Sequence, residues 1–471
     1  MRRRPNILFV FADQHRAAAT GCYGNREVRT PTIDRLAEQG LRALNMISNA
    51  PLCQPYRASL MTGMYAFKCG APANFQTFRP PVACIGNVLR KAGYAMGYVG
   101  KLHLYFPTGD RSIDNGPDID SEWVPLGSAR LGFDDYWRGI NEGHDFHDWH
   151  YFRQDDPTPV HCREYMPYVQ TDQALEFIRD QENRNREWCL FVSWTPPHPP
   201  FHPPLGMAER YRNLSIPANV PEGSPRDYFR KSAPQYYACI ESIDVALERL
   251  LAGLKSAGAD ENTIVVYTAD HGELLAAHGY MGHKRWPYDE SLRVPFIIRG
   301  PRIPSGKTLT KPIAAIDLYP TLLELPGVEL PQAVDGKSAA HAIRTGDESK
   351  RDDFVYCQMH YSYVPWPGWK GLRSERYLYA RTVESPWLLF DLHADPLEMN
   401  NLINKRSHRG LREELDATLT RRMKEAGDSW DFRLDTGDTK DYADVRLGKQ
   451  VINDMGFAWP GGPHPFSYDT L

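Results

Sequence analysis

Three runs of apolar residues stand out along the chain, and they cover residues 6–12, 188–194 and 262–268. Apolar runs of this length, without polar alternation, are typical of strands that are buried on both faces of a parallel sheet. The first run ends at Asp13 and Gln14, and the third is followed by Asp270 and His271. Because open α/β sheets bind ligands at the carboxyl ends of their strands, we expect these four side chains to meet. Two carboxylates, an amide oxygen and an imidazole form a candidate site for a divalent cation.

Amphipathic segments lie between these runs. Residues 171–182 have a helical pattern, Thr30-Pro31 places a proline at a helix start, and six apolar residues before the third run share one helical face: Ile240, Ile243, Leu247, Leu250, Leu251 and Leu254. Buried strands that alternate with helices predict an α/β fold with a large, mostly parallel central sheet.

The pattern changes after about residue 350. Residues 377–380 and 387–392 are typical of antiparallel strands, and a helical pattern follows over 411–423. We therefore divide the chain into a main domain over residues 1–350, a smaller C-terminal α+β lobe over 351–429 with an antiparallel sheet, and an extended tail over 430–471. Within the main domain, residues 105–165 have little periodicity and are interpreted as an insertion near the mouth of the site.

The tail contains no clear helix or strand pattern, but it is rich in aromatic residues: Trp430, Phe432, Phe457, Trp459 and Phe466. A free disordered segment is poor in such residues. We therefore expect the tail to pack on a neighbouring lobe or on a second copy of the chain, which would make a homo-oligomer.

Composition narrows the classes of partner. The 471 residues are 42% hydrophobic and 24% charged, with a formal net charge of −4. This balance provides no basic field for nucleic acid and no polybasic patch for a membrane surface, and no apolar run approaches the length of a membrane span. We expect neither nucleic acid nor membrane as a partner.

The N-terminus imitates a signal peptide, because three arginines precede the apolar residues 7–11. That apolar run is too short, and no cleavage site of small residues follows it. The eight cysteines also lack the spacing of a disulfide framework or of a metal site. These features predict an unprocessed start and a cytoplasmic protein.

The most informative motif is Cys53-Gln54-Pro55-Tyr56-Arg57, with Thr62-Gly63 after it. A cysteine near an arginine is in general a candidate for an activated thiolate. This segment, however, resembles position by position the motif by which sulfatases have one cysteine oxidised to formylglycine. The chain is thus similar to the formylglycine-dependent sulfatases of the alkaline phosphatase superfamily.

The resemblance extends over nearly the whole chain. It includes residues 5–14 as the first strand and metal pair, 268–273 as the second pair, Gly100-Lys101-Leu102-His103, the loop 197–201 around His198, the segment 282–284 with Lys284, and residues 390–402 in the C-terminal lobe. It implies the sandwich fold of the superfamily and the hydrolysis of a sulfate monoester. The implied substrate is a small molecule or an oligosaccharide, most of all a sulfated sugar, with choline sulfate and aryl sulfates left open. A maturation enzyme that generates formylglycine is an implied partner.

The resemblance also assigns roles. Asp13, Gln14, Asp270, His271 and the oxygen of residue 53 would hold one divalent cation. The catalytic set would be Cys53, Arg57, Lys101, His103, His198 and Lys284. In this scheme Arg57 holds the hydrated aldehyde, and Lys101 and Lys284 bind the sulfate oxygens. His198 and Lys284 protonate the leaving alcohol, and His103 takes the proton that allows sulfate to leave.

Two positions depart from many family members, which have Asp in place of Gln14 and Asn in place of His271. An imidazole ligand suits Mn²⁺ better than Ca²⁺. Ca²⁺ remains the first choice from the family, with Mn²⁺ or Mg²⁺ as alternatives. The same pair of residues also occurs in the related phosphonate monoester hydrolases, so a phosphonate monoester or phosphodiester hydrolase is the alternative function. A second alternative is a catalytically silent anion-binding protein in which Cys53 stays a thiol.

Two further groups are weaker candidates. His144, His147, His150 and His161 could form a second metal site, although their spacing matches no standard motif. The segment Trp366-Pro367-Gly368-Trp369 could stack on a sugar or pack on a neighbouring lobe.

Overall fold

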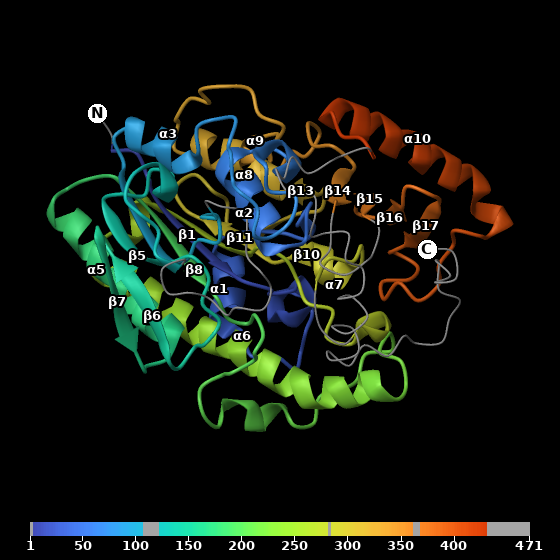
Figure 1. Ribbon diagram of the computed structural model, residues 1–471, viewed down its shortest axis with the longest axis horizontal. Helices are drawn as coiled ribbons and strands as arrows, with labels where there is room; N and C mark the ends of the chain where they lie inside the picture. Colours follow the sequence, from blue (N-terminus) through green and yellow to red (C-terminus); the bar gives the residue numbers. More distant parts are fainter. Residues whose placement is uncertain (1–2, 107–121, 281–283, 361–367, 431–471) are drawn as a thin grey trace.

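The computed structural model describes residues 3–106, 122–280, 284–360 and 368–430 (Figure 1). Its centre is a sheet in which the three predicted buried strands are neighbours: β1 (Asn6–Ala12) lies between β8 (Trp188–Trp194) and β9 (Thr263–Ala269). Both pairings are parallel, and Ala12 is level with Trp194 on one side and Ala269 on the other. The polar residues that follow these strands therefore emerge at one edge of the sheet.

Ten strands make up this sheet, and most of their pairings are parallel. The order is β12-β2-β11-β9-β1-β8-β4-β5-β6-β7. The remaining strands are β2 (Leu41–Ala43), β4 (Ala95–Lys101), β5 (Tyr136–Ile140), β6 (Trp149–Arg153), β7 (Asp156–Cys162), β11 (Phe296–Arg299) and β12 (Lys307–Leu309). Antiparallel pairs occur toward the two sides, where β11 joins β9 to β2 and β6 joins β5 to β7. The predicted α/β fold with a mostly parallel sheet is confirmed.

The segment 105–165 supplies three of these strands, β5 to β7, although its sequence predicted none. The outermost strand, β7, contains Pro157 and Pro159 and is largely exposed. Prolines are tolerated at such an edge because no further strand needs their missing N–H groups. Residues 107–121 of the predicted insertion lie outside the described residues.

Helices cover both faces of the sheet (Figure 1). One layer contains α6 with α1 and α5, both of which contact it, and the other contains α2, α3, α8 and α9. Their bounds are α1 (Pro31–Gln39), α2 (Cys53–Thr62), α3 (Ile85–Lys91), α5 (Met166–Asn183), α6 (Ser224–Ser256), α8 (Ala315–Glu324) and α9 (Ala340–Thr345). The predicted helix at 240–254 is the second half of the longer α6, and five of its six apolar residues are fully buried.

The C-terminal lobe is a second, smaller sheet with a helix packed on it. Its antiparallel strands are β14 (Val355–Met359), β15 (Trp369–Arg373), β16 (Tyr377–Arg381) and β17 (Pro386–Asp391), and the helix is α10 (Arg409–Ala426). A three-stranded sheet lies beside it and consists of β3 (Met46–Ile47), β10 (Arg293–Val294) and β13 (Ile313–Ala314). The short helix α7 (Asp289–Leu292) directly precedes β10 in the sequence. Ile47 and Ala314 share one apolar cluster with Val355 and Phe390, so the lobe is packed onto the main domain.

Trp430 packs against the lobe, and the Lys370 Nζ atom lies 5.6 Å from the centre of its ring. The rest of the tail, residues 431–471, lies outside the described residues. Its docking therefore stays a prediction.

Candidate active site

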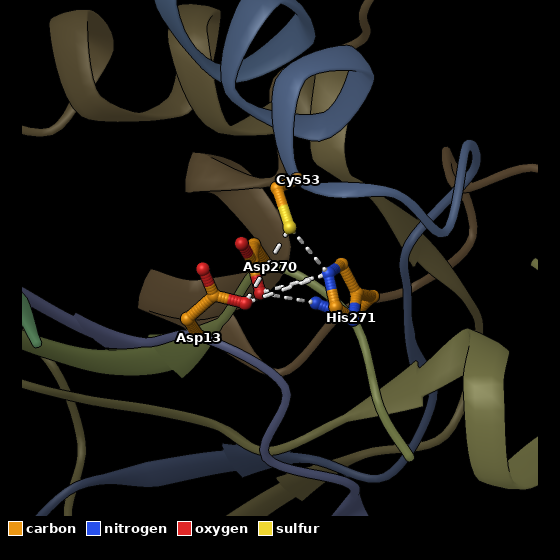
Figure 2. Close-up of side chains that lie close together, drawn as sticks. All are labelled: Asp13, Cys53, Asp270 and His271. Atoms are coloured by element: carbon orange, nitrogen blue, oxygen red, sulfur yellow. Dashed lines mark hydrogen bonds and ion pairs between the residues drawn. The ribbon is translucent and has the colours of Figure 1, made fainter. Parts of the chain in front are cut away.

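Cys53 is the first residue of α2 and is 1% exposed. Figure 2 shows its side chain pointing from the start of this helix toward Asp13, Asp270 and His271. The Sγ atom lies 3.2 Å from His271 Nε2 and 3.6 Å from Asp13 Oδ1. The motif cysteine and the two strand-end dipeptides, which are far apart in sequence, thus converge at one point.

The sheet explains why the two aspartates meet. Asp13 follows β1 and Asp270 follows β9, and these strands are parallel neighbours in register. His271 Nε2 lies 3.6 Å from Asp13 Oδ1 and 3.6 Å from Asp270 Oδ1. All three side chains are fully buried.

This donor set fits one divalent cation. Ligand atoms from Asp13, Cys53, Asp270 and His271 all lie within 4.8 Å of one another. Ligands that lie about 2.0–2.6 Å from an ion have this mutual spacing. Burial alone would raise the pKa of Asp13, but the charges of Lys101 and Arg57 hold that pKa well below its usual range. Burial lowers the pKa of His271, so its ring is neutral and can donate an electron pair.

Arg57 lies one helical turn after Cys53 and holds the two carboxylates from the other side. Its Nη2 lies 3.4 Å from Asp13 Oδ2 and 3.3 Å from Asp270 Oδ2, while Nη1 donates to the Lys101 carbonyl and to Ser193 Oγ. Asp13 Oδ1 is thereby left for a cation, while Asp270 Oδ1 also accepts the backbone N–H groups of Gln14 and His271. The Nε of Arg57 has no hydrogen-bond partner among the described residues.

Lys101 ends β4, and its buried Nζ lies 2.7 Å from Asp13 Oδ2. The residue before it must be glycine. A Cβ at Gly100 would lie 2.1 Å from the Ser193 carbonyl oxygen, and the φ of Gly100 is +98°. Burial alone would lower the pKa of Lys101, but Asp13 raises it, so the ammonium stays charged.

Lys284, His198 and Gln14 form a second polar group beside the carboxylates. Lys284 Nζ lies 2.6 Å from Gln14 Oε1 and 2.8 Å from His198 Nε2. Gln14 Nε2 donates to Glu273, and the Gln14 backbone N–H donates to Asp270 Oδ1 at 3.0 Å. The resemblance implies Gln14 as a metal ligand. Its amide oxygen accepts a hydrogen bond from Lys284, and because an amide oxygen has two lone pairs, one is left for a cation.

His103 follows Lys101 closely in sequence, but among the described residues its side chain contacts Glu142. Its Nε2 lies 3.4 Å from Glu142 Oε1, and its ring packs edge-on against Phe75 and Phe106. The Nδ1 atom is buried and has no hydrogen-bond partner among the described residues.

The four histidines that suggested a second metal site do not come together in the described part of the chain. His144 lies at the active site, 3.3 Å from Lys101 Nζ through its Nε2, and its ring centre is 4.4 Å from that of His198. His147 Nε2 faces the His202 carbonyl, and His150 faces His161 across β6 and β7. The hypothesis is wrong because β6 begins between these residues and carries His150 away from His144.

A different cluster, His278, Glu290 and Glu398, also places three ligand atoms within 4.8 Å of one another. His278 Nε2 lies 3.4 Å from Glu290 Oε2. Burial and then Glu290 raise the pKa of Glu398 well above its usual range. A protonated Glu398 can lie beside the Glu290 carboxylate without a cation between them.

Trp369 does not lie where it could stack on a sugar. It is 2% exposed in the cluster between the main domain and the lobe, and its Nε1 donates to the Arg285 carbonyl at 2.7 Å. The alternative interpretation, packing between lobes, is confirmed for this residue. Trp366 lies outside the described residues.

Some site residues carried little or no signal in the sequence. Glu142 and Ser193 contact the predicted residues but belong to no motif that we identified, His144 was considered only for a second metal site, and Glu273 lies in the segment 268–273 without an assigned role. Only the folding of separate loops onto one edge of the sheet places them here.

Comparison with protein families gives two matches. The model of the Sulfatase family matches residues 5–328, and the model of the C-terminal region of N-sulphoglucosamine sulphohydrolase matches residues 276–425. A similar protein is an ulvan-active sulfatase of Formosa agariphila, 32% identical over 91% of this chain and 83% of its own length. An endo-4-O-sulfatase of Bacteroides thetaiotaomicron is 28% identical over 90% of this chain and 93% of its own length.

Solved structures agree with this. A crystal structure from Bacteroides fragilis, of a protein assigned there to the sulfatases as yidJ, has a TM-score of 0.82 and 31% identity over 91% of this chain and 98% of its own. A phosphonate monoester hydrolase of Agrobacterium radiobacter has a TM-score of 0.70 at 21% identity, over 90% of this chain and 96% of its own, which shows a shared fold. Among the described helices, none combines the length and the apolar character that a bilayer span requires.

Proposed function

This chain belongs to the sulfatase family of the alkaline phosphatase superfamily and is a sulfuric ester hydrolase, and we propose that it removes sulfate from a sulfated sugar with a formylglycine at position 53 and one divalent cation. The observation that carries the proposal is the convergence of Cys53 Sγ with Asp13, Asp270 and His271. The sulfated-sugar substrate is supported by relatives such as the ulvan-active sulfatase and an N-acetylglucosamine-6-O-sulfatase of Bacteroides thetaiotaomicron, which is 25% identical over 91% of this chain and 88% of its own length.

The sulfur of Cys53 stands in for an oxygen of the hydrated aldehyde. Formylglycine supplies a hydroxyl nucleophile and a second hydroxyl through which sulfate is eliminated. The cation would be held by Asp13, Gln14, Asp270, His271 and residue 53, and when bound it lowers the pKa of a coordinated hydroxyl and neutralises sulfate charge. Arg57 fixes the orientation of both carboxylates, and its unpartnered Nε is the donor left for the oxygen of residue 53.

Two ammonium groups would bind the sulfate oxygens. Lys101 Nζ and Lys284 Nζ each reach the ligand cluster, one through Asp13 and the other through Gln14. In a buried site such charges act strongly on a transferred group with three electronegative oxygens. The two lysines therefore orient the ester for attack.

The remaining step needs proton transfer at two places. Lys284 and His198 form one donor pair for the leaving alcohol, because their nitrogens lie 2.8 Å apart. His103, supported by Glu142, would accept the proton that accompanies release of sulfate from residue 53.

For the cation, Ca²⁺ is our first choice and Mn²⁺ the second, with Mg²⁺ as a further alternative. The carboxylates suit any of these ions, whereas the imidazole of His271 favours Mn²⁺. The presence of Gln14 and His271 in the site also favours the alternative function. In this alternative, the same site residues would hydrolyse a phosphonate monoester or a phosphodiester.

The test is a screen of defined substrates with protein made beside a formylglycine-generating enzyme, after peptide mass spectrometry has shown the state of Cys53. The panel contains sulfated monosaccharides and oligosaccharides, choline sulfate, nitrophenyl sulfate, a phosphonate monoester and a phosphodiester. We expect the highest kcat/KM on a sulfated sugar. A higher kcat/KM on the phosphodiester than on every sulfate would favour the alternative, and full turnover with an unmodified thiol would refute the formylglycine mechanism.

A further inference from the structure

His144 is an imidazole at the active site to which the proposed chemistry gives no role. It lies in the loop between β5 and β6, where its Nε2 is 3.3 Å from Lys101 Nζ. Its ring also packs against His198, with a centroid distance of 4.4 Å and an interplanar angle of 32°. His144 thus contacts Lys101 directly, and it contacts His198, which lies beside Lys284. It is therefore placed to affect both lysines that would bind sulfate.

The direction of the hydrogen bond follows from the chemistry of the two groups. An ammonium has three donors and no acceptor, so Lys101 donates and Nε2 of His144 accepts. Burial and then the charge of Lys101 lower the pKa of His144 to about 3, which keeps the ring neutral for this task. His198 accepts from Lys284 in the same way.

This contact determines how the ammonium of Lys101 is oriented. One N–H points to Asp13 Oδ2 at 2.7 Å and a second points to His144 Nε2. With two of three tetrahedral directions fixed, the third is fixed as well, and it is the one left for a sulfate oxygen. The three N–H groups turn together about the Cε–Nζ bond, so without the imidazole acceptor this rotation is held by Asp13 alone.

We propose that His144 is a positioning residue, which aims the Lys101 ammonium at the substrate sulfate through its Nε2 acceptor and braces His198 through contact between the two rings. The inference rests on the proposed function, because it requires Lys101 to bind a sulfate group. It adds a residue that belongs to no motif of the sequence.

The experiment compares three substitutions at this position. His144→Ala removes the acceptor, and His144→Asn leaves an amide that is too short to replace Nε2. His144→Gln places an amide oxygen near the position of Nε2 and can restore the acceptor. For each variant we measure kcat and KM on the best sulfate ester and the dissociation constant of inorganic sulfate by calorimetry, with His150→Gln as a matched control outside the site.

We expect KM and the sulfate dissociation constant to rise together for the Ala and Asn variants, by about 10- to 100-fold, as for a lost hydrogen bond to a charged group. We expect the Gln variant to stay within about threefold of the native protein, because the acceptor is restored. The kcat should change less than KM, since Lys101 holds the sulfate before and during reaction.

Sulfate binding in His144→Ala equal to that of the native protein would overturn the inference alone. So would an equal loss in the Gln and Ala variants whose thermal unfolding matches the native protein. A native protein that neither hydrolyses sulfate esters nor binds sulfate would overturn the proposed function together with this inference.

Discussion

Lys284 Nζ lies 2.8 Å from His198 Nε2, while the other ring nitrogen of His198 lies 2.6 Å from the Pro199 carbonyl oxygen. A carbonyl oxygen only accepts, so Nδ1 carries the ring proton and Nε2 accepts from the lysine. Burial, and then the charge of Lys284, hold the pKa of His198 well below its usual range. The proton that faces the site is therefore on Lys284, and His198 positions it.

This relationship predicts how the two residues differ in catalysis. A sugar alkoxide needs a proton in order to leave, whereas nitrophenolate does not. We expect Lys284→Ala to lower kcat/KM on a sugar sulfate by about 10²–10⁴-fold and to have a much smaller effect on nitrophenyl sulfate. His198→Ala should show the same selectivity with a smaller loss.

Steady-state kinetics on both substrates checks this prediction, with Lys91→Ala on the exposed end of α3 as a control. Equal losses of Lys284→Ala on both substrates would show that the lysine only binds sulfate. His198 would then be the acid of the two residues to which the resemblance gave this role.

His103 is expected to act after the alcohol has left. His103→Ala should reduce kcat on the sugar sulfate and on nitrophenyl sulfate by similar factors, because release of sulfate from residue 53 no longer involves the alcohol. Glu142→Gln removes the charge 3.4 Å from His103 Nε2 and should give a smaller loss of the same kind. A leaving-group dependence in the His103 variant would contradict this order of events.

The protein is expected to bind one divalent cation. Asp270→Asn removes a charge from the ligand cluster and should abolish stoichiometric metal, whereas Glu398→Gln in the other carboxylate cluster should leave the metal content unchanged. Elemental analysis of both variants and of the native protein measures this directly. Two ions per chain, or an active sample that contains none, would disagree with the prediction.

Asp244 is expected to make stability depend on pH. Its carboxylate accepts the backbone N–H groups of Thr32 and Ile33 at the start of α1, and burial raises its pKa to about 6. Because this is above the value of about 3.9 in an unfolded chain, the folded protein binds the proton more tightly. The stabilisation is complete below pH 4 and is lost as pH rises through 6, a change of about 3 kcal/mol.

Asp244→Asn keeps an acceptor oxygen for both N–H groups and cannot ionise. The variant should therefore unfold at higher urea concentration than the native protein above pH 6, and the difference should shrink toward pH 4. Urea midpoints across pH 4–7 test this, with Asp227→Asn, an exposed carboxylate in the first turn of α6, as a comparison. A difference that does not change with pH would show that the charge of Asp244 is not responsible.

The sequence by itself determined the central strands, the family and most of the chemical groups of the site. The apolar runs at residues 6–12 and 188–194 coincide with β1 and β8, because full burial on both faces permits only apolar side chains. The motif at Cys53 could be identified from the sequence because a processing enzyme must recognise a local sequence. The meeting of the polar residues after β1 and β9 could be predicted because both follow buried strands, and these strands are parallel neighbours in register.

Only the tertiary structure decided which partner each of these groups has. Arg57 holds two carboxylates, Gln14 accepts from Lys284, and His144 orients Lys101, and none of these contacts follows from a local pattern. Each joins side chains more than 40 residues apart in sequence, on helices, strands and loops whose relative positions depend on the packing of the whole sheet. Local sequence specifies which chemical groups are present, but the direction of a hydrogen bond depends on distances of a few tenths of an ångström, which are set when all the elements are packed together.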